Sequence, residues 1–274
     1  MSTAHVNDIE IEHEVIGQGE PLLLIHGSNL ATGLAPLAAA LAVEGPSHEV
    51  VRYHRRGMAG TGGRGWPISV QQQAADALGL LDALGLPSTH VLGYSYGAVI
   101  ALETALSAPG RVRSLALLEP ILTEVPGAQA FMAGMEPVMS LYAAGDMAGA
   151  ASTTFAGLGG PDWRKLLATA GPDAYDLAVR DTELFYRAEA PSLTTWTLDP
   201  TRAAAVRTPL LSVIGTHSGP FFKESRQLLH QRFARCTDAD IPGATHLLHL
   251  QAPELIASAV ADFLQRLSPP KQTS

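Results

Sequence analysis

The sequence predicts an α/β fold with a mostly parallel, doubly wound sheet, helices on both faces and a helical cap inserted after strand six. Three observations carry this prediction. Through the first 120 residues, apolar strand patterns alternate with helical patterns, which is typical of a parallel sheet. From residue 121 to 199 the patterns are helical, and at Pro209 a buried-strand pattern returns. We therefore expect a core domain of residues 1–120 and 200–274 and a cap of residues 121–199.

The expected elements follow from hydrophobic periodicity and from Gly and Pro breaks. Residues 8–16 alternate polar and apolar, which predicts an exposed antiparallel edge strand. Continuous apolar runs predict buried strands, and Ala- and Leu-rich stretches predict helices, the first of which ends at Gly45-Pro46. The expected strands are 21–25, 49–53, 89–92, 112–118, 209–215 and 238–241, and the expected helices are 34–44, 70–84, 96–106, 222–233 and 253–267.

Composition excludes several classes of protein. The 274 residues carry 18 Lys and Arg against 26 Asp and Glu, a net charge of −8, which disfavours binding to nucleic acid or to anionic membranes. No apolar stretch is long enough to span a membrane, and residues 1–14 do not resemble a secretory signal. The single cysteine, Cys236, allows no intrachain disulfide. We expect a cytoplasmic protein that acts on a small molecule; the sequence leaves its oligomeric state open.

The motif Gly93-Tyr94-Ser95-Tyr96-Gly97 stands where an expected strand meets an expected helix. A serine on such a tight turn is held in a strained conformation that exposes its hydroxyl above the sheet. The amide of Tyr96, at the helix N-terminus, is a candidate donor to developing negative charge. The alternative is an ordinary strand-to-helix turn with a passive serine.

With this motif the chain resembles the α/β-hydrolase fold superfamily over residues 8–267. The resemblance also rests on His26-Gly27 after an early strand and on Pro242-Gly-Ala-Thr-His246 near the end. Tyr53-His-Arg-Arg-Gly57 is similar to the family's loop after the fourth strand, although an aspartate is more usual than His54. The resemblance implies a Ser–His–acid hydrolase whose oxyanion donors are the amides of Tyr96 and Ser28.

The resemblance assigns the general base to His246, because family members have a histidine in the loop before the last helix. An imidazole there would take the proton of Ser95 and return it to the leaving group. The alternative is a structural loop histidine. His249 lies three residues further on, but two histidines without carboxylate or cysteine company are weak evidence for zinc, so no metal is expected.

The acid is harder to assign. Family members usually have an aspartate shortly after strand seven, where this chain has Ser218. Some members place the acid after strand six, and Glu119 stands there, at the carboxyl end of an expected central strand. We therefore select Glu119. A dyad without an acid, or a carboxylate from the cap or another loop, remains the alternative.

The expected cap holds eight of the chain's 16 aromatic residues and four of its six methionines. Such side chains suit an adaptable apolar pocket, although a small cap also needs them for its own core. We expect a cofactor-free hydrolase of a carboxylic ester, lactone or related acyl bond. The alternatives are a ligand-binding protein without turnover, and a C–C bond hydrolase, perhydrolase or cofactor-free oxygenase on the same fold.

Overall fold

The computed structural model describes residues 1–44 and 48–267. The expected helix stop at Gly45-Pro46 and residues 268–274 of the expected core lie outside the described residues. Within the described part of the chain, no helix is both long and apolar enough to cross a membrane.

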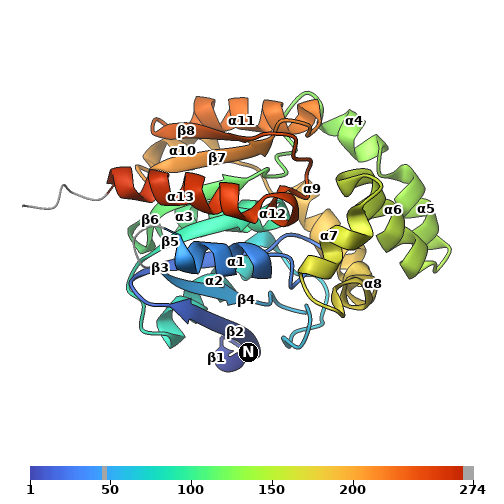
Figure 1. The fold of residues 1–274 in the computed structure, drawn as a ribbon, viewed down its shortest axis with the longest axis horizontal. Coiled ribbons are helices and arrows are strands. Elements are labelled where there is room, and N and C mark those ends of the chain that lie inside the picture. The colour runs from blue at the N-terminus through green and yellow to red at the C-terminus, as the bar shows by residue number, and fades with distance from the viewer. Residues whose placement is uncertain (45–47, 268–274) are drawn as a thin grey trace, which may run out of the picture.

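One eight-stranded sheet runs through the molecule in the order β1-β2-β4-β3-β5-β6-β7-β8 (Figure 1). In this order β2 pairs antiparallel with both β1 and β4. All other neighbouring pairs, from β4–β3 to β7–β8, are parallel. This confirms the predicted mostly parallel sheet. The strands are β1 (Ser2–Val6), β2 (Ile9–Gly17), β3 (Glu20–Ile25), β4 (His48–Tyr53), β5 (Thr89–Tyr94), β6 (Val112–Leu118), β7 (Leu210–Gly215) and β8 (Cys236–Ile241).

The prediction that residues 8–16 form an edge strand was wrong. The strand there, β2, pairs with β4 on one side and with β1 on the other, so β1 is the edge. Strand β1 is only five residues long and mostly exposed. Its sequence lacks the alternation of apolar and polar residues that marks a strand. Alternation in β2 arises because only one of its faces packs on the core.

Helices cover both faces of the sheet, as the alternation of patterns predicts (Figure 1). One core contains buried side chains of α2 and α3, and the other contains those of α1 and α13. The helices outside residues 121–199 are α1 (Ala35–Val43), α2 (Val70–Ala83), α3 (Tyr96–Ser107), α10 (Pro200–Ala205), α11 (Pro220–Arg232), α12 (Leu248–Gln251) and α13 (Pro253–Leu267). A 3-10 turn, η1 (Pro109–Arg111), precedes β6.

Residues 121–199, which follow β6, are mostly helical, and Figure 1 shows their helices gathered beside one end of the sheet. They are α4 (Ala128–Ala133), α5 (Glu136–Ala143), α6 (Met147–Gly159), α7 (Trp163–Thr169), α8 (Ala174–Leu184), the π-helical turn η2 (Phe185–Glu189) and α9 (Ala190–Thr195). Part of their apolar content, around Phe155, Trp163 and Leu167, packs in one cluster with Leu30, Leu247 and Leu250, which lie outside this segment.

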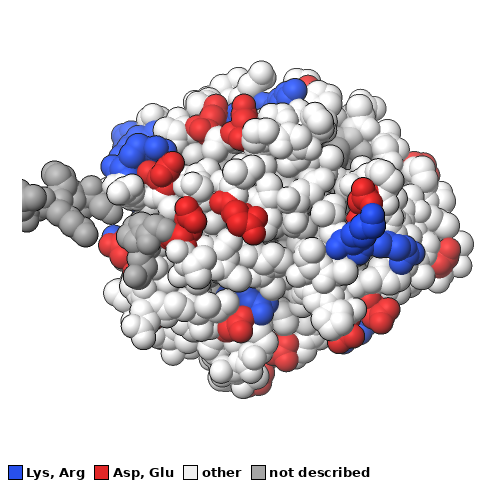
Figure 2. All heavy atoms as spheres, in the orientation of Figure 1, with Lys and Arg blue, Asp and Glu red and all other residues white. Residues whose placement is uncertain are grey.

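Charged side chains are dispersed over the face drawn in Figure 2. Red acidic groups and fewer blue basic groups are scattered there among larger areas of other residues.

Candidate active site

Ser95 occupies a sharp backbone turn between β5 and α3. Its φ of 55° and ψ of −119° lie in a region that L residues rarely adopt. The amide of Ser95 donates to the carbonyl oxygen of Leu118 at 2.9 Å, which ties the turn to the end of β6. Strain of this kind is retained where the surrounding structure fixes the chain, and it aims the side chain out of the sheet.

The two glycines of the motif are required by close backbone contacts. A Cβ on Gly93 would lie 2.5 Å from the carbonyl oxygen of Gly97. A Cβ on Gly97 would lie 2.2 Å from the carbonyl oxygen of Ile25 and 2.3 Å from that of His26. Neither position tolerates a side chain, because backbone atoms cannot move aside as a flexible side chain can.

Ser95, His246 and Glu119 form a continuous chain of polar contacts. Ser95 Oγ lies 3.0 Å from Nε2 of His246. The Nδ1–H of the same ring donates to Oε2 of Glu119 at 2.6 Å. All three side chains are buried. Since the carboxylate can only accept, this contact places the ring proton on Nδ1 and leaves Nε2 free to accept the serine proton.

Glu119 is held by groups from β7 and its loop. Its Oε1 accepts from the amide of Gly215 at 2.7 Å and from the hydroxyl of Ser218 at 2.5 Å. The backbone of Glu119 has a φ of 46°, a second strained position in the site. Ser218, at the position where an aspartate is usual in the family that the chain resembles, thus supports the carboxylate that comes from β6.

His246 is held by aromatic packing and by a tight turn. Its ring stacks on Phe222, with 4.4 Å between the ring centroids and 12° between the planes. The hydroxyl of Tyr94 donates to the backbone oxygen of His246 at 2.9 Å. Gly243, with φ of 72°, makes the turn that leads into this loop. These contacts leave the imidazole little freedom to swing away from Ser95.

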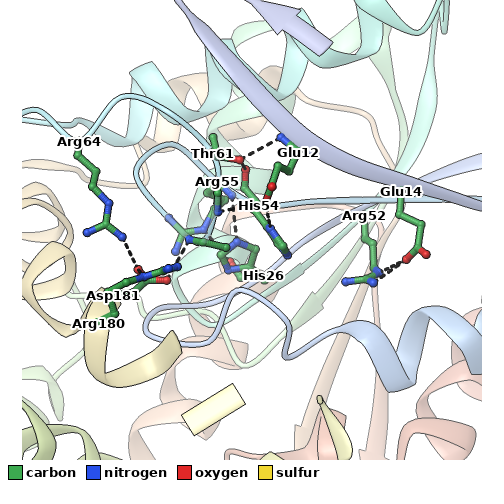
Figure 3. Close-up of polar contacts among 12 residues, drawn as sticks. Glu12, Glu14, His26, Arg52, His54, Arg55, Thr61, Arg64, Arg180 and Asp181 are labelled. Carbon is green, nitrogen blue, oxygen red and sulfur yellow. Dashed lines mark hydrogen bonds and ion pairs between the residues drawn. The ribbon is translucent and has the colours of Figure 1, made fainter. Parts of the chain in front are cut away.

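The loop that carries Ser28 is fixed by a buried arginine. Arg55, 1% exposed, donates through Nε to the backbone oxygen of His26 and through Nη2 to that of Gly27, at 3.0 and 2.9 Å. Figure 3 shows Arg55 beside His26. Burial and the Arg55 charge hold the pKa of His26 well below its ordinary value, so this ring stays neutral.

The same arginine links this loop to the helices between β6 and β7. Arg55 Nη2 lies 2.5 Å from Oε1 of Glu189 in η2, and both side chains are 1% exposed. A second buried contact joins the Tyr96 hydroxyl to Ser192 Oγ at 2.6 Å. A third contact, drawn in Figure 3, joins the exposed side chain of Arg64 to the buried Asp181 at 2.7 Å. Charged and hydroxyl groups therefore connect the part of the site that carries Arg55 and Tyr96 to the helices that follow β6.

A cavity of about 430 Å³ opens over Ser95 and His246, and Ser28 also lines it. Most of its wall is apolar, and it includes seven of the aromatic and methionine residues between β6 and β7: Phe131, Phe155, Phe185, Tyr186, Met132, Met135 and Met139. Glu136 is the only Asp, Glu, Lys or Arg side chain among the described residues that line this cavity. The cavity thus suits an apolar ligand without a negative charge.

The structure brings the predicted site residues Ser95, His246 and Glu119 into contact, and it places Ser28 in the cavity wall with Ser95. Tyr96 begins α3 directly after Ser95. Sequence reasoning missed Arg55 and Glu189. A pair of arginines in a glycine-rich loop gave no signal that one of them is buried, because its partner lies far along the chain.

Comparison with known proteins agrees with this fold. A model of the alpha/beta hydrolase family matches residues 22–259. The chain therefore belongs to the alpha/beta hydrolase family, as the motifs predicted. A thermophilic esterase from Thermogutta terrifontis superposes with a TM-score of 0.81 at 20% identity, covering 98% of this chain and 99% of that one, which supports the fold.

Curated relatives match over shorter segments. A putative carbamate hydrolase RutD of Azorhizobium caulinodans is 37% identical over 43% of this chain and 44% of its own. A 2-hydroxymuconate semialdehyde hydrolase of Pseudomonas putida is 33% identical over 40% of each chain. A rhodomycin D methylesterase DauP of a Streptomyces species is 34% identical over 36% of this chain and 34% of its own. The matches span less than half the length of these relatives.

Proposed function

We propose that this protein is a cofactor-independent serine hydrolase of carboxylic esters or lactones with a small, neutral, apolar acyl group. The observation that supports this most is the chain of contacts from Ser95 through His246 to Glu119 at the floor of an apolar cavity. In this proposal residues 121–199 act as a cap over that cavity. A cytoplasmic location is part of the proposal and rests on the single cysteine.

In the first half of the reaction, Ser95 Oγ attacks the ester carbonyl carbon while Nε2 of His246 takes the serine proton. The carbonyl oxygen becomes negative and accepts hydrogen bonds from the amides of Tyr96 and Ser28. The bond to the leaving alcohol oxygen breaks, and His246 delivers the proton to that oxygen. Glu119 holds the ring in the required tautomer and offsets the positive charge that forms on it.

In the second half, water attacks the acyl-enzyme. His246 accepts one water proton, the hydroxide adds to the acyl carbon, and the ester bond to Ser95 Oγ breaks. The proton returns to Ser95. One ester and one water thus give one acid and one alcohol, and Ser95 and His246 return to their starting protonation states.

The charge of the cavity favours esters over the substrates of C–C bond hydrolases. One relative is named for a muconate semialdehyde, a substrate that carries a carboxylate. An anionic substrate in an apolar site needs a cationic partner, and no Lys or Arg is among the described residues that line the cavity. The methylesterase name of another relative agrees with the ester assignment.

A binder without turnover is the alternative from another class. It would need no activated nucleophile, whereas the 3.0 Å contact between Ser95 Oγ and Nε2 of His246 supports one.

A panel of p-nitrophenyl esters with two to twelve acyl carbons, assayed with the wild type and with Ser95→Ala, tests the proposal. We expect turnover by the wild type on at least the shorter acyl groups and a loss of at least about 1,000-fold in the variant. Equal rates for the two proteins, or no turnover by the folded wild type, would show that the proposal is wrong.

A further inference from the structure

A second cavity, of about 510 Å³, lies against the first one. The two cavities share three lining residues, His246, Phe131 and Leu158. The rest of the second cavity is formed by the end of α6, by α4 and the residue before it, by the segment that joins β7 to α11, by the first residues of α11 and by Thr245 in the loop after β8. Several of its lining residues are exposed, among them Ala130, Gly157 and Gly219, so the cavity is open to solvent.

The two cavities differ in which reacting groups they reach. The first is lined by Ser28, Ser95 and His246, whereas the second is lined by His246 but by neither Ser28 nor Ser95. The second cavity therefore lies on the imidazole side of the site, away from the nucleophile and from the candidate oxyanion donors.

The chemistry of acyl transfer explains why one cavity would reach Ser95 and His246 and the other only His246. The oxygen of the leaving alcohol must lie within hydrogen-bond reach of His246 Nε2, because it receives its proton from that atom. The acyl chain is attached to the carbon that bonds Ser95 Oγ. The two arms of an ester therefore diverge, one from the serine and the other from the imidazole.

We propose that the second cavity is the binding site for the alcohol arm of the substrate, and that the acyl arm occupies the first cavity. This inference rests on the proposed ester hydrolysis and names the part of the substrate that each cavity takes. The alcohol is then released through the cavity that held it, while the acyl group stays bonded to Ser95 Oγ.

The walls of the second cavity define the chemistry of that arm. Phe131 stacks on Phe221, with 4.2 Å between the ring centroids and 11° between the planes, and Phe222 stacks on the His246 ring. No Asp, Glu, Lys or Arg side chain is among its described lining residues. Its polar side chains are His217, Ser218, Thr245 and His246. A flat, neutral arm such as a benzyl or phenyl group fits this wall.

Phe131 is the divider between the two arms. It lines both cavities, and it is only half-buried although it stacks on the aromatic cluster next to His246. Removing its ring would join the two spaces, so the size of residue 131 sets how bulky the two arms can be close to the ester bond.

Gly157 offers a way to fill the second cavity without disturbing the catalytic groups. It lies in α6 and lines only the second of the two cavities, and no heavy atom lies within 4 Å of a Cβ placed on it. Gly110, in η1, is equally free of neighbours and lines neither cavity. Gly157→Phe is therefore the test variant and Gly110→Phe its matched control.

The experiment measures kcat/KM for the methyl and benzyl esters of one acid with the wild type and both variants. We expect Gly157→Phe to lower the benzyl-to-methyl ratio at least tenfold and Gly110→Phe to leave it within twofold of the wild type. Phe131→Ala should raise relative turnover of a branched alcohol ester such as the isopropyl ester. Unfolding in urea checks that the variants are folded.

An unchanged benzyl-to-methyl ratio in folded Gly157→Phe would overturn the inference. So would an effect of this variant on acyl-chain preference in a series of methyl esters. Methyl ester turnover that disappears in Ser95→Ala tests the proposed function separately, so a failure of the inference can be told apart from a failure of the proposed function.

Discussion

The hydroxyl of Ser218, after β7, donates a hydrogen bond of 2.5 Å to the carboxylate of Glu119, after β6. The two positions lie side by side because β6 and β7 are paired parallel strands. One carboxylate oxygen faces Ser218 and the amide of Gly215, and the other faces His246. A neutral residue at the usual acid position is thus compatible with a negative charge next to the imidazole.

Glu119→Gln should lower kcat by about 10³ to 10⁴-fold, because an amide can stabilise the wrong ring tautomer and cannot offset the imidazolium charge. Steady-state kinetics on the best ester of the panel measures this. Urea unfolding is the control, since the isosteric change should leave the variant folded. Turnover within tenfold of the wild type would remove Glu119 from the mechanism.

Ser218→Ala should cost less, about tenfold in kcat, because the amide of Gly215 still holds Glu119. Ser218→Asp places two carboxylates in contact and should lower activity further. In the double variant Glu119→Gln with Ser218→Asp, the new carboxylate comes from the position where related enzymes carry one. We expect it to regain at least tenfold over Glu119→Gln alone; the absence of any recovery would show that residue 218 cannot reach the imidazole.

Breaking the ion pair between Arg55 and Glu189 should strongly destabilise the protein, because it leaves a buried charge without its partner. Glu189→Gln is expected to lower the free energy of unfolding by about 3 kcal/mol. In a double-mutant cycle with Arg55→Met, the two losses should be non-additive by more than about 1 kcal/mol. Urea unfolding of the four proteins measures this, and additive losses would mean that the two charges do not interact.

Acid should destabilise the protein through His249. Burial, together with the charge of His246, lowers the pKa of His249 from 6.5 to about 3. The unfolded chain therefore binds a proton that the folded chain excludes, so stability is full above about pH 6.5 and falls as the pH drops toward 3. One such proton gives a slope of up to about 1.4 kcal/mol per pH unit.

His249→Phe should remove that part of the slope between pH 6 and pH 5. Phenylalanine retains the packing on Tyr94, whose ring centroid lies 3.9 Å from that of His249. The free energy of unfolding in urea, measured at pH 5, 6, 7 and 8, provides the comparison. Between pH 7 and pH 8 the two proteins should show the same dependence. An equal slope at pH 5 to 6 would mean that His249 is not the group that binds the proton.

Much of the fold could be read from the sequence because the buried parallel strands are continuous apolar runs. β6 and α13 have the predicted bounds of 112–118 and 253–267, and most other elements differ by a few residues. β1 was missed because its pairing with β2, not its own pattern, makes it a strand. The four-residue helix α12 is also too short to give a periodic signal.

The site could be predicted from the sequence for a different reason. Ser95 stands in a local motif whose geometry depends on adjacent glycines. The contact between Glu119 and His246, in contrast, joins residues 127 positions apart and depends on strand pairing. No local sequence pattern encodes the other features of the site. The hydrogen bond from Ser218 to Glu119, the hydrogen bonds from Arg55 to the loop of Ser28 and the second cavity all depend on tertiary contacts.

The most direct test of the account is mass spectrometry of the protein after treatment with a fluorophosphonate. The reagent phosphonylates a serine whose hydroxyl is activated by a neighbouring base. We predict one adduct, mapped to the peptide that contains Ser95, which is lost in Ser95→Ala and forms at least about 100-fold more slowly in His246→Ala. A folded wild-type protein that gains no adduct at Ser95, or a rate unaffected by the loss of the imidazole, would contradict the account.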